Sequence, residues 1–276
     1  MTSWTGSLLL VVASFAAAEE PPRAAGEHPF PEAERRMMND RFDRGIGMLS
    51  KRINDEPPNL NLHSQRGDAR MFLGRFKEAI ADYDRMVEID RQYDRSHWRR
   101  GIAYYFSGQY AEAIKQFDVY HEEDDVDREG GIWRYFAQYK KDSPEKAREG
   151  LQRYTKEDRE PFNTLYEFFQ GKLTADEVFA KIEKGSLEEQ DKKRQLFYVH
   201  LYIGLDHAVA GREDEARKHL REAVANDWGR FAQYGPRYMW HVGRVEYDRL
   251  SGFAPKPVAP AKPGDKPQPQ PDPGVN

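Results

Sequence analysis

The chain has no cysteine among its 276 residues. This absence excludes disulfide bonds, a thiol nucleophile, cysteine-ligated zinc and the thioether-linked lipid anchor of bacterial lipoproteins. A surplus of basic residues is also missing, because 43 Lys and Arg stand against 47 Asp and Glu and leave a net charge of -4. Neutralising nucleic-acid phosphates requires such a surplus, so we expect no nucleic-acid partner.

A hydrophobic run long enough to cross a membrane is lacking as well. The mean hydropathy is -0.92. The apolar stretch LLLVVASF at residues 8–15 is far shorter than the roughly 20 residues that span a bilayer. We therefore expect no integral membrane anchor.

Three alanines and an acidic, proline-containing segment follow this stretch at residues 16–22. Together they predict a secretory signal peptide over residues 1–18 with cleavage near Ala18, and hence an exported protein, periplasmic or secreted. The segment before the apolar stretch contains no Lys or Arg. A cytosolic protein with an apolar N-terminus therefore stays open as the alternative.

The rest of the chain divides by composition. Fifteen Phe, fifteen Tyr and five Trp supply enough apolar area for an ordered core. Residues 254–276 combine frequent proline with Gln, Asp and Lys, which predicts a disordered tail. We expect residues 19–31 to be a disordered mature N-terminus and residues 32–253 to be the folded body.

The folded body contains an internal repeat of 34 residues. When residues 60–91 are laid over residues 94–125, twelve of the thirty-two aligned positions are identical, where chance supplies roughly two. Within GIAYYFSGQYAEAIKQF, apolar residues recur at three- and four-residue spacing, as they do in amphipathic helices. The interval and pattern resemble the tetratricopeptide repeat (TPR) family, with a small residue in helix A, a glycine turn and an alanine in helix B.

Stepping by the same interval locates further units. A degenerate first repeat surrounds Gly45, and divergent pairs follow around Ala147 and over residues 162–184. A regular repeat returns at residues 196–227, and an aromatic-rich helix follows it. The fold class is therefore all-α, a helix-turn-helix solenoid of about five helix pairs plus terminal helices.

Local residues predict where the helices end and how they pack. We expect Gly74, Gly108, Gly171 and Gly211 to end helices, because glycine adopts a positive φ without a Cβ clash. Ser143 and Thr174 are predicted to cap the helices that follow them. The small residues at Gly67, Gly101 and Gly204 are expected to face Ala79, Ala113 and Ala216 across each helix pair.

No pattern of catalytic residues appears in the sequence. The densest group of potential ligands runs from His121 to Asp125, but a solvated charge run that ends a helix explains it without an ion. The histidines show no HExxH spacing, and there is no nucleophile elbow or phosphate-binding glycine loop. We therefore predict a protein that is not an enzyme and has no cofactor and no metal site.

The predicted binding surface is the concave face lined by helix A of successive repeats. Aromatic and arginine side chains there match the composition of protein interfaces, which favours capture of a peptide or protein segment. The alternative, that these side chains pack against neighbouring helices, stays open. Ser64 and Asp68 stand where chaperone-binding TPR domains require Lys and Asn, so a chaperone tail is not the expected ligand. The candidate residues are Arg95, Trp98, Arg99, Ile102, Tyr105, Trp133, Phe136 and Tyr139.

The C-terminal half, from Trp133 through residues 166–184 to the run ending at Phe231, resembles the NlpI-type TPR lipoproteins. Members of that family are helical dimers that act as periplasmic adaptors between a processing protease and cell-wall hydrolases. The resemblance implies an adaptor or scaffold in the cell envelope and a possible homodimer. This chain departs from the family in lacking the lipidated cysteine and in adding the proline-rich tail. Two other functions stay open, a structural self-associating subunit and a metal-dependent enzyme accessory.

Overall fold

The computed structural model describes residues 28–254. Over that range the chain forms fourteen helices and no strand. The expected signal peptide, residues 19–27 and the tail from residue 255 lie outside the described residues. In chain order the helices are α1 (Glu32–Asp55), α2 (Leu60–Phe72), α3 (Phe76–Ile89), α4 (Tyr93–Ser96), α5 (Trp98–Phe106), α6 (Tyr110–Glu123), α7 (Arg128–Lys141), α8 (Pro144–Glu149), α9 (Phe162–Phe169), α10 (Ala175–Lys184), α11 (Glu189–Val209), α12 (Glu213–Ala225), α13 (Asp227–Phe231) and α14 (Tyr234–Leu250).

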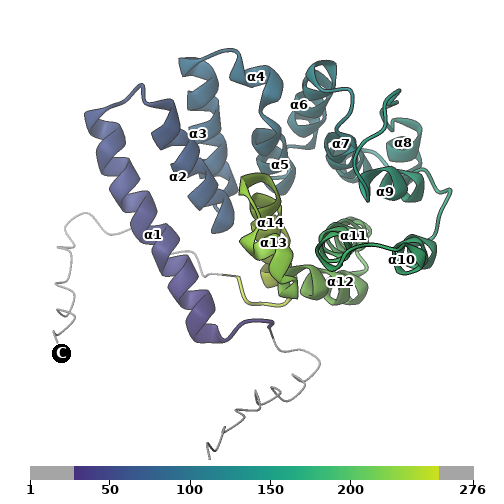
Figure 1. Ribbon diagram of the computed structural model, residues 1–276. Helices are drawn as coiled ribbons and strands as arrows, with labels where there is room; N and C mark the ends of the chain where they lie inside the picture. The colour runs from purple at the N-terminus through teal and green to yellow at the C-terminus, as the bar shows by residue number, and fades with distance from the viewer. Residues whose placement is uncertain (1–27, 255–276) are drawn as a thin grey trace, which may run out of the picture.

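Ten of these helices pack as consecutive pairs, α2 with α3, α5 with α6, α7 with α8, α9 with α10 and α11 with α12. In Figure 1 the helices from α1 to α9 follow an arc, and α13 and α14 lie inside it. The five pairs and the terminal helices confirm the predicted all-α solenoid. The expected first repeat is instead a single 24-residue helix, α1, which packs on α2 as the second helix of a pair would.

The predicted helix ends are confirmed. Gly74, Gly108, Gly171 and Gly211 all have φ between 72° and 80°, the left-handed region that costs glycine least. The two predicted caps also form. The side chain of Ser143 accepts a hydrogen bond from the backbone N–H of Lys146. The side chain of Thr174 accepts one from the backbone N–H of Glu177, and the Glu177 carboxylate accepts one from the backbone N–H of Thr174.

The glycines inside the pairs touch different neighbours from those predicted. An added Cβ at Gly67 would lie 2.6 Å from the Tyr83 ring, and one at Gly101 would lie 2.7 Å from the Phe117 ring. At the third such position, Gly204, the nearest atoms belong to Leu220. The missing side chain therefore makes room for a large residue of helix B rather than for its alanine.

The folded body begins earlier than residue 32. His28 is buried and donates a hydrogen bond from Nε2 to the Asp248 carboxylate at 2.9 Å. The Phe30 ring lies edge-on to Trp240 with centroids 5.8 Å apart. Residues 28–31, which we expected to be disordered, thus pack against α14.

Helix α14 is joined to α1 and α2 through a buried charge. The Arg244 guanidinium is completely buried and donates to the Asp248 carboxylate at 3.0 Å. It also donates to the Phe72 carbonyl at the end of α2 and to Asn39 of α1. One side chain on α14 therefore holds the first two helices of the solenoid.

His97, at the start of α5, makes stability depend on pH. Burial, and then the neighbouring Arg99 and Arg100, lower the pKa of His97 to about 3. The pKa of histidine in the unfolded chain is about 6.5. Above that pH His97 is neutral in both states and does not change stability. As the pH falls from 6.5 toward 3, only the unfolded state binds a proton, so stability is lost. By pH 5 the loss is about 2 kcal/mol.

The His97→Gln variant isolates this effect. Urea unfolding at pH 7 and pH 5 is expected to show a decrease in the free energy of unfolding that is smaller in the variant than in the wild type by about 2 kcal/mol. Equal decreases in the two proteins would mean that folding does not lower the pKa of His97.

Candidate functional site

The concave face of the first repeats is occupied by the chain itself. Tyr238 of α14 packs edge-on against Trp98 of α5, with ring centroids 4.9 Å apart, and against Phe72 of α2 at 5.1 Å. His241, one turn further along, stacks on Phe72 at 4.1 Å. Helix α14 therefore lies where we expected an external peptide to bind in the first two repeats.

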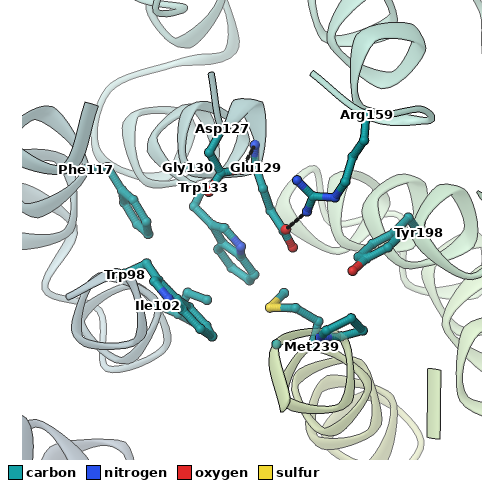
Figure 2. A pocket seen from close by; sticks show the side chains of 12 residues that line it. Trp98, Ile102, Phe117, Asp127, Glu129, Gly130, Trp133, Arg159, Tyr198 and Met239 are labelled. Carbon is teal, nitrogen blue, oxygen red and sulfur yellow. Dashed lines mark hydrogen bonds and ion pairs between the residues drawn. The ribbon is translucent and has the colours of Figure 1, made fainter. Parts of the chain in front are cut away.

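A cavity remains beside this contact, and we call it the central cavity. It has a volume of about 290 Å³, at the lower end of the range of about 300–1,000 Å³ for ligand pockets. Helices α5, α6, α7, α11 and α14 and the loop before α9 all contribute to its wall (Figure 2). The lining residues are Trp98, Ile102, Phe117, Asp127, Glu129, Gly130, Trp133, Arg159, Tyr198, Gly235, Pro236 and Met239.

One end of the central cavity carries charge. Glu129 Oε2 accepts from Arg159 at 3.2 Å, and the Tyr202 hydroxyl donates to Oε1. Asp127, which caps α7 by accepting from the Glu129 N–H, lies beside it. Burial, and then the negative charge of Asp127, raise the pKa of Glu129 well above its usual range, while Arg159 opposes the shift. At this polar end of the cavity, the Glu129 carboxyl group can therefore keep its proton near neutral pH.

The Trp133 side chain offers a hydrogen-bond donor to this space. Its residue is 1% exposed, and the indole Nε1 has no hydrogen-bond partner among the described residues. Figure 2 shows this nitrogen turned toward the space between Glu129 and Met239. A buried donor left unpaired costs about 1–3 kcal/mol, so an acceptor atom that reached this nitrogen would recover that energy.

The predicted binding residues fall into three groups. Trp98, Ile102 and Trp133 line the central cavity together. Phe136 is fully buried, while Tyr105 and Tyr139 are half-buried and belong to the aromatic packing around Phe136 and Tyr135.

The two predicted arginines bind carboxylates of the chain. Arg99 donates to Asp68 at 2.7 Å, and it also bonds the Tyr234 hydroxyl at the start of α14. Arg95 lies on the exposed surface, where it pairs with Glu123 at 2.5 Å. Arg99 thus helps to hold α14 in place, and Arg95 lies away from the central cavity.

Several residues of the central cavity were absent from the sequence-based set. Glu129 lies one helical turn before Trp133 on the same face of α7, so the helical spacing could have identified it. Arg159, Tyr198 and Met239 come from segments outside the 34-residue pattern of α5 and α7. No local signal connects these three residues, because only the return of α11 and α14 brings them to one space.

The acidic run from His121 to Asp125 has local partners. The His121 ring lies edge-on to Tyr154, and Asp124 accepts hydrogen bonds from two backbone N–H groups of its own turn. Asp125 pairs with Lys156 at 2.7 Å. Within residues 28–254, no group of three or more His, Asp or Glu side chains is arranged to hold a metal ion.

Comparison with known proteins identifies the repeat. Residues 67–108, from the second turn of α2 to the turn after α5, match the family model of the TPR repeat. The described residues form an all-α helix-turn-helix solenoid that is consistent with TPR packing and contains this repeat. TPR repeats are typical of protein–protein interaction and scaffold proteins, which indicates that this chain has a protein partner. A search of the curated proteins finds no match. In the part of the chain that the structure describes, none of the helices has the length and apolar character needed to span a bilayer.

Proposed function

We propose that this protein is a non-enzymatic adaptor that binds a segment of a partner protein, with one large side chain of that segment inserted into the central cavity. The observation that carries the proposal is the unpaired indole N–H of Trp133 at the wall of a cavity of about 290 Å³. Trp98, Ile102 and Met239 supply apolar surface for the inserted side chain. An acceptor atom at its end would receive the Trp133 hydrogen bond.

The occupied concave face supports this narrower site. An open TPR groove would bind an extended segment along several repeats, but α14 covers the aromatic side chains of α2 and α5. The contact that stays available is a pocket for a single anchor. Interfaces commonly draw most of their affinity from one or a few such buried anchors.

Blocking the central cavity tests the proposal. Gly235 lines the cavity, and an added Cβ there would meet no atom of the described residues within 4 Å. The Gly235→Phe variant is therefore expected to fold normally while filling the entrance. Peptides selected on the wild-type protein from a displayed library should bind this variant at least about tenfold more weakly, a loss of about 1.4 kcal/mol or more.

Two control variants accompany this experiment. Gly47→Phe adds the same side chain on the exposed side of α1, where a Cβ also meets no atom within 4 Å in the described part of the chain. Arg95→Ala removes a predicted binding residue that lies outside the cavity. Both controls should retain the wild-type affinity. Selected peptides that bind Gly235→Phe as tightly as the wild type, or that lose affinity for Arg95→Ala instead, would contradict the cavity as the binding site.

The setting of this adaptor is part of the proposal. The apolar stretch at residues 8–15 and the alanines that follow it favour export to the cell envelope. The resemblance of the C-terminal half to NlpI-type proteins supports recruitment of a processing protease or of cell-wall hydrolases as the adaptor's task.

Self-association is a second role that one observation favours. Met37 and Met48 are 64% and 66% exposed and lie eleven residues apart on α1, about three helical turns, so they share one face. An exposed pair of large apolar side chains on a terminal helix is suited to contact with a second copy. We include a homodimer through α1 in the proposal, since it would leave the central cavity free.

A further inference from the structure

A second cavity, separate from the central one, lies among α7, α8, α9 and the loop that joins α8 to α9. Its volume is about 580 Å³, which is within the range for small-molecule sites. Four basic side chains line it, Arg128, Arg148, Arg153 and Lys172. We call it the arginine cavity.

None of these four cations forms an ion pair within residues 28–254. Arg148 reaches only the Phe169 carbonyl, at 3.4 Å, and Arg153 and Lys172 have no side-chain hydrogen bond there. Three acidic residues also line the wall. Glu149 pairs with Lys146 at 2.8 Å and Glu167 pairs with Lys181 at 2.7 Å, both outside the cavity lining, while Glu157 forms no ion pair among the described residues. Two of the three carboxylates are paired outside the cavity, so the four basic side chains leave the lining of the arginine cavity with a net positive charge even when Glu157 is counted.

Arg128 is the exceptional member of this set, because it is only 8% exposed. Its guanidinium lies over the Tyr154 ring, 5.1 Å from the centroid, and its remaining contact is to the Val126 carbonyl at 3.5 Å. A buried cation normally has a carboxylate partner, as Arg244 has in Asp248 and Arg99 has in Asp68. Arg128 has none among the described residues, although it faces a cavity large enough to hold one from outside the chain.

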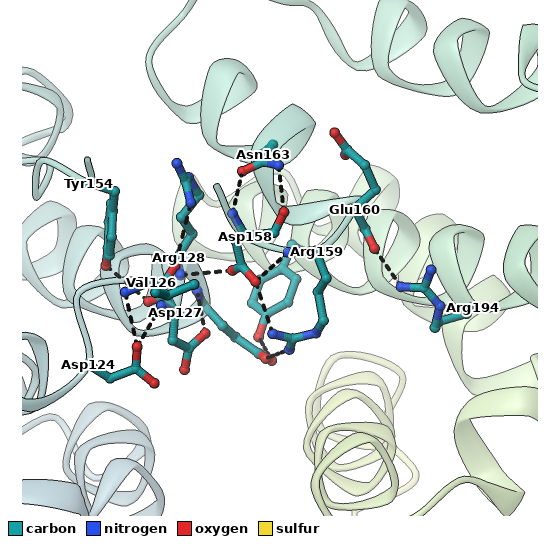
Figure 3. A network of polar contacts seen from close by, with 12 residues as sticks. Asp124, Val126, Asp127, Arg128, Tyr154, Asp158, Arg159, Glu160, Asn163 and Arg194 are labelled. Atoms are coloured by element: carbon teal, nitrogen blue, oxygen red, sulfur yellow. Dashed lines mark hydrogen bonds and ion pairs between the residues drawn. The ribbon is translucent and has the colours of Figure 1, made fainter. Parts of the chain in front are cut away.

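A network of hydrogen bonds within the chain holds the wall around Arg128 (Figure 3). The Asp158 carboxylate accepts from the Arg128 backbone N–H at 3.1 Å, and the Asn163 amide bonds both the N–H and the carbonyl of Asp158. The Tyr154 and Tyr166 hydroxyls donate to the carbonyls of Asp127 and Gln152. These bonds pin the loop between α8 and α9 onto α7, so a ligand would not have to order it.

We propose that the arginine cavity binds a small multivalent phosphate. The guanidinium group matches the geometry of phosphate oxygens, to which it can donate two parallel hydrogen bonds. An anion of this kind would supply the counter-charge that Arg128 lacks, and Arg148 and Lys172 would neutralise its further charges. The inference is independent of the protein-binding role of the central cavity, because the two cavities share no lining residue.

Titration calorimetry with inorganic pyrophosphate, at constant ionic strength, tests the site on the full chain. We expect saturable binding of one pyrophosphate per chain. At one hundred times its Kd, pyrophosphate should raise the melting temperature by roughly 5–10 °C. The exposed-residue variants Arg148→Gln and Lys172→Gln should each weaken binding by about tenfold. Arg128→Gln should weaken it more.

Lys184→Gln is the matched control. Lys184 is exposed on α10, has no ion pair within the described range and does not line the cavity. This variant loses the same charge and should keep the wild-type affinity for pyrophosphate. If Arg128→Gln fails to fold, the two exposed-residue variants still decide the outcome.

Three results would overturn the proposal. The first is the absence of saturable pyrophosphate binding. The second is equal weakening by Lys184→Gln and by Lys172→Gln, which would show attraction to overall charge rather than a site. The third is citrate binding as tightly as pyrophosphate at matched ionic strength, which would show that the cavity selects charge and not phosphate.

Discussion

Replacing Gly101 by leucine is expected to destabilise the protein by about 3 kcal/mol, because the added side chain has no room. A Cβ at this position would lie 2.7 Å from the ring of Phe117, which is itself fully buried and packed in the core. The ring cannot move aside without separating α5 from α6. Urea unfolding followed by far-UV circular dichroism measures the loss.

A leucine at Gly47 provides the comparison. Gly47 is also a helical glycine, but it is exposed on α1, and within residues 28–254 an added Cβ meets nothing closer than 4 Å. There the change should stabilise the protein by about 0.5–1 kcal/mol, since leucine is a better helix former than glycine. If Gly101→Leu were as stable as the wild type or more stable, close packing against Phe117 would not explain the glycine at position 101.

The Arg244→Met variant is expected to lose about 3–5 kcal/mol, the cost of leaving a buried partner charge uncompensated. Asp248 would keep only its hydrogen bond from His28, and the Phe72 carbonyl would lose its donor. Burial lowers the pKa of Arg244, and the charge and hydrogen bond of Asp248 oppose that shift. The buried Arg244–Asp248 pair therefore has a desolvation penalty that its hydrogen bonds offset. Chemical unfolding of the full chain measures the effect.

The double variant Arg244→Met with Asp248→Leu separates the charge from the packing. Removing both charges should restore most of the lost stability, because no buried ion is then left alone. A double variant as unstable as the single one would show that the hydrogen bonds to Phe72 and Asn39, rather than the charge balance, hold α14 against the concave face.

The repeat architecture was predictable from residues close together in the chain. The 34-residue identities relate neighbouring repeats. The glycines at the turns and the Ser143 and Thr174 caps are local signals, since each depends on backbone conformation within a few residues. Such signals survive in a single sequence. The packing partner of Gly67 was predicted wrongly, because periodicity shows that a small residue is needed but not which side chain fills the space.

The binding site was predictable only in part. Trp98, Ile102 and Trp133 follow from the helix A register and do line the central cavity. The register says nothing about what covers the rest of the concave face. The aromatic composition of α14 was visible in the sequence, but an aromatic helix at the end of a solenoid can pack inside the hollow or associate with a partner.

The sequence by itself therefore determined the helices of the repeats and their pairing, because these depend on contacts within a repeat and between neighbouring repeats. Only the tertiary structure decided that α14 packs on the concave face of the first repeats. It likewise decided that Glu129, Arg159 and Tyr198 line one cavity. It also decided that Arg128 is buried with no carboxylate partner among residues 28–254. These features depend on contacts between residues far apart in the chain, and no periodic pattern records such contacts.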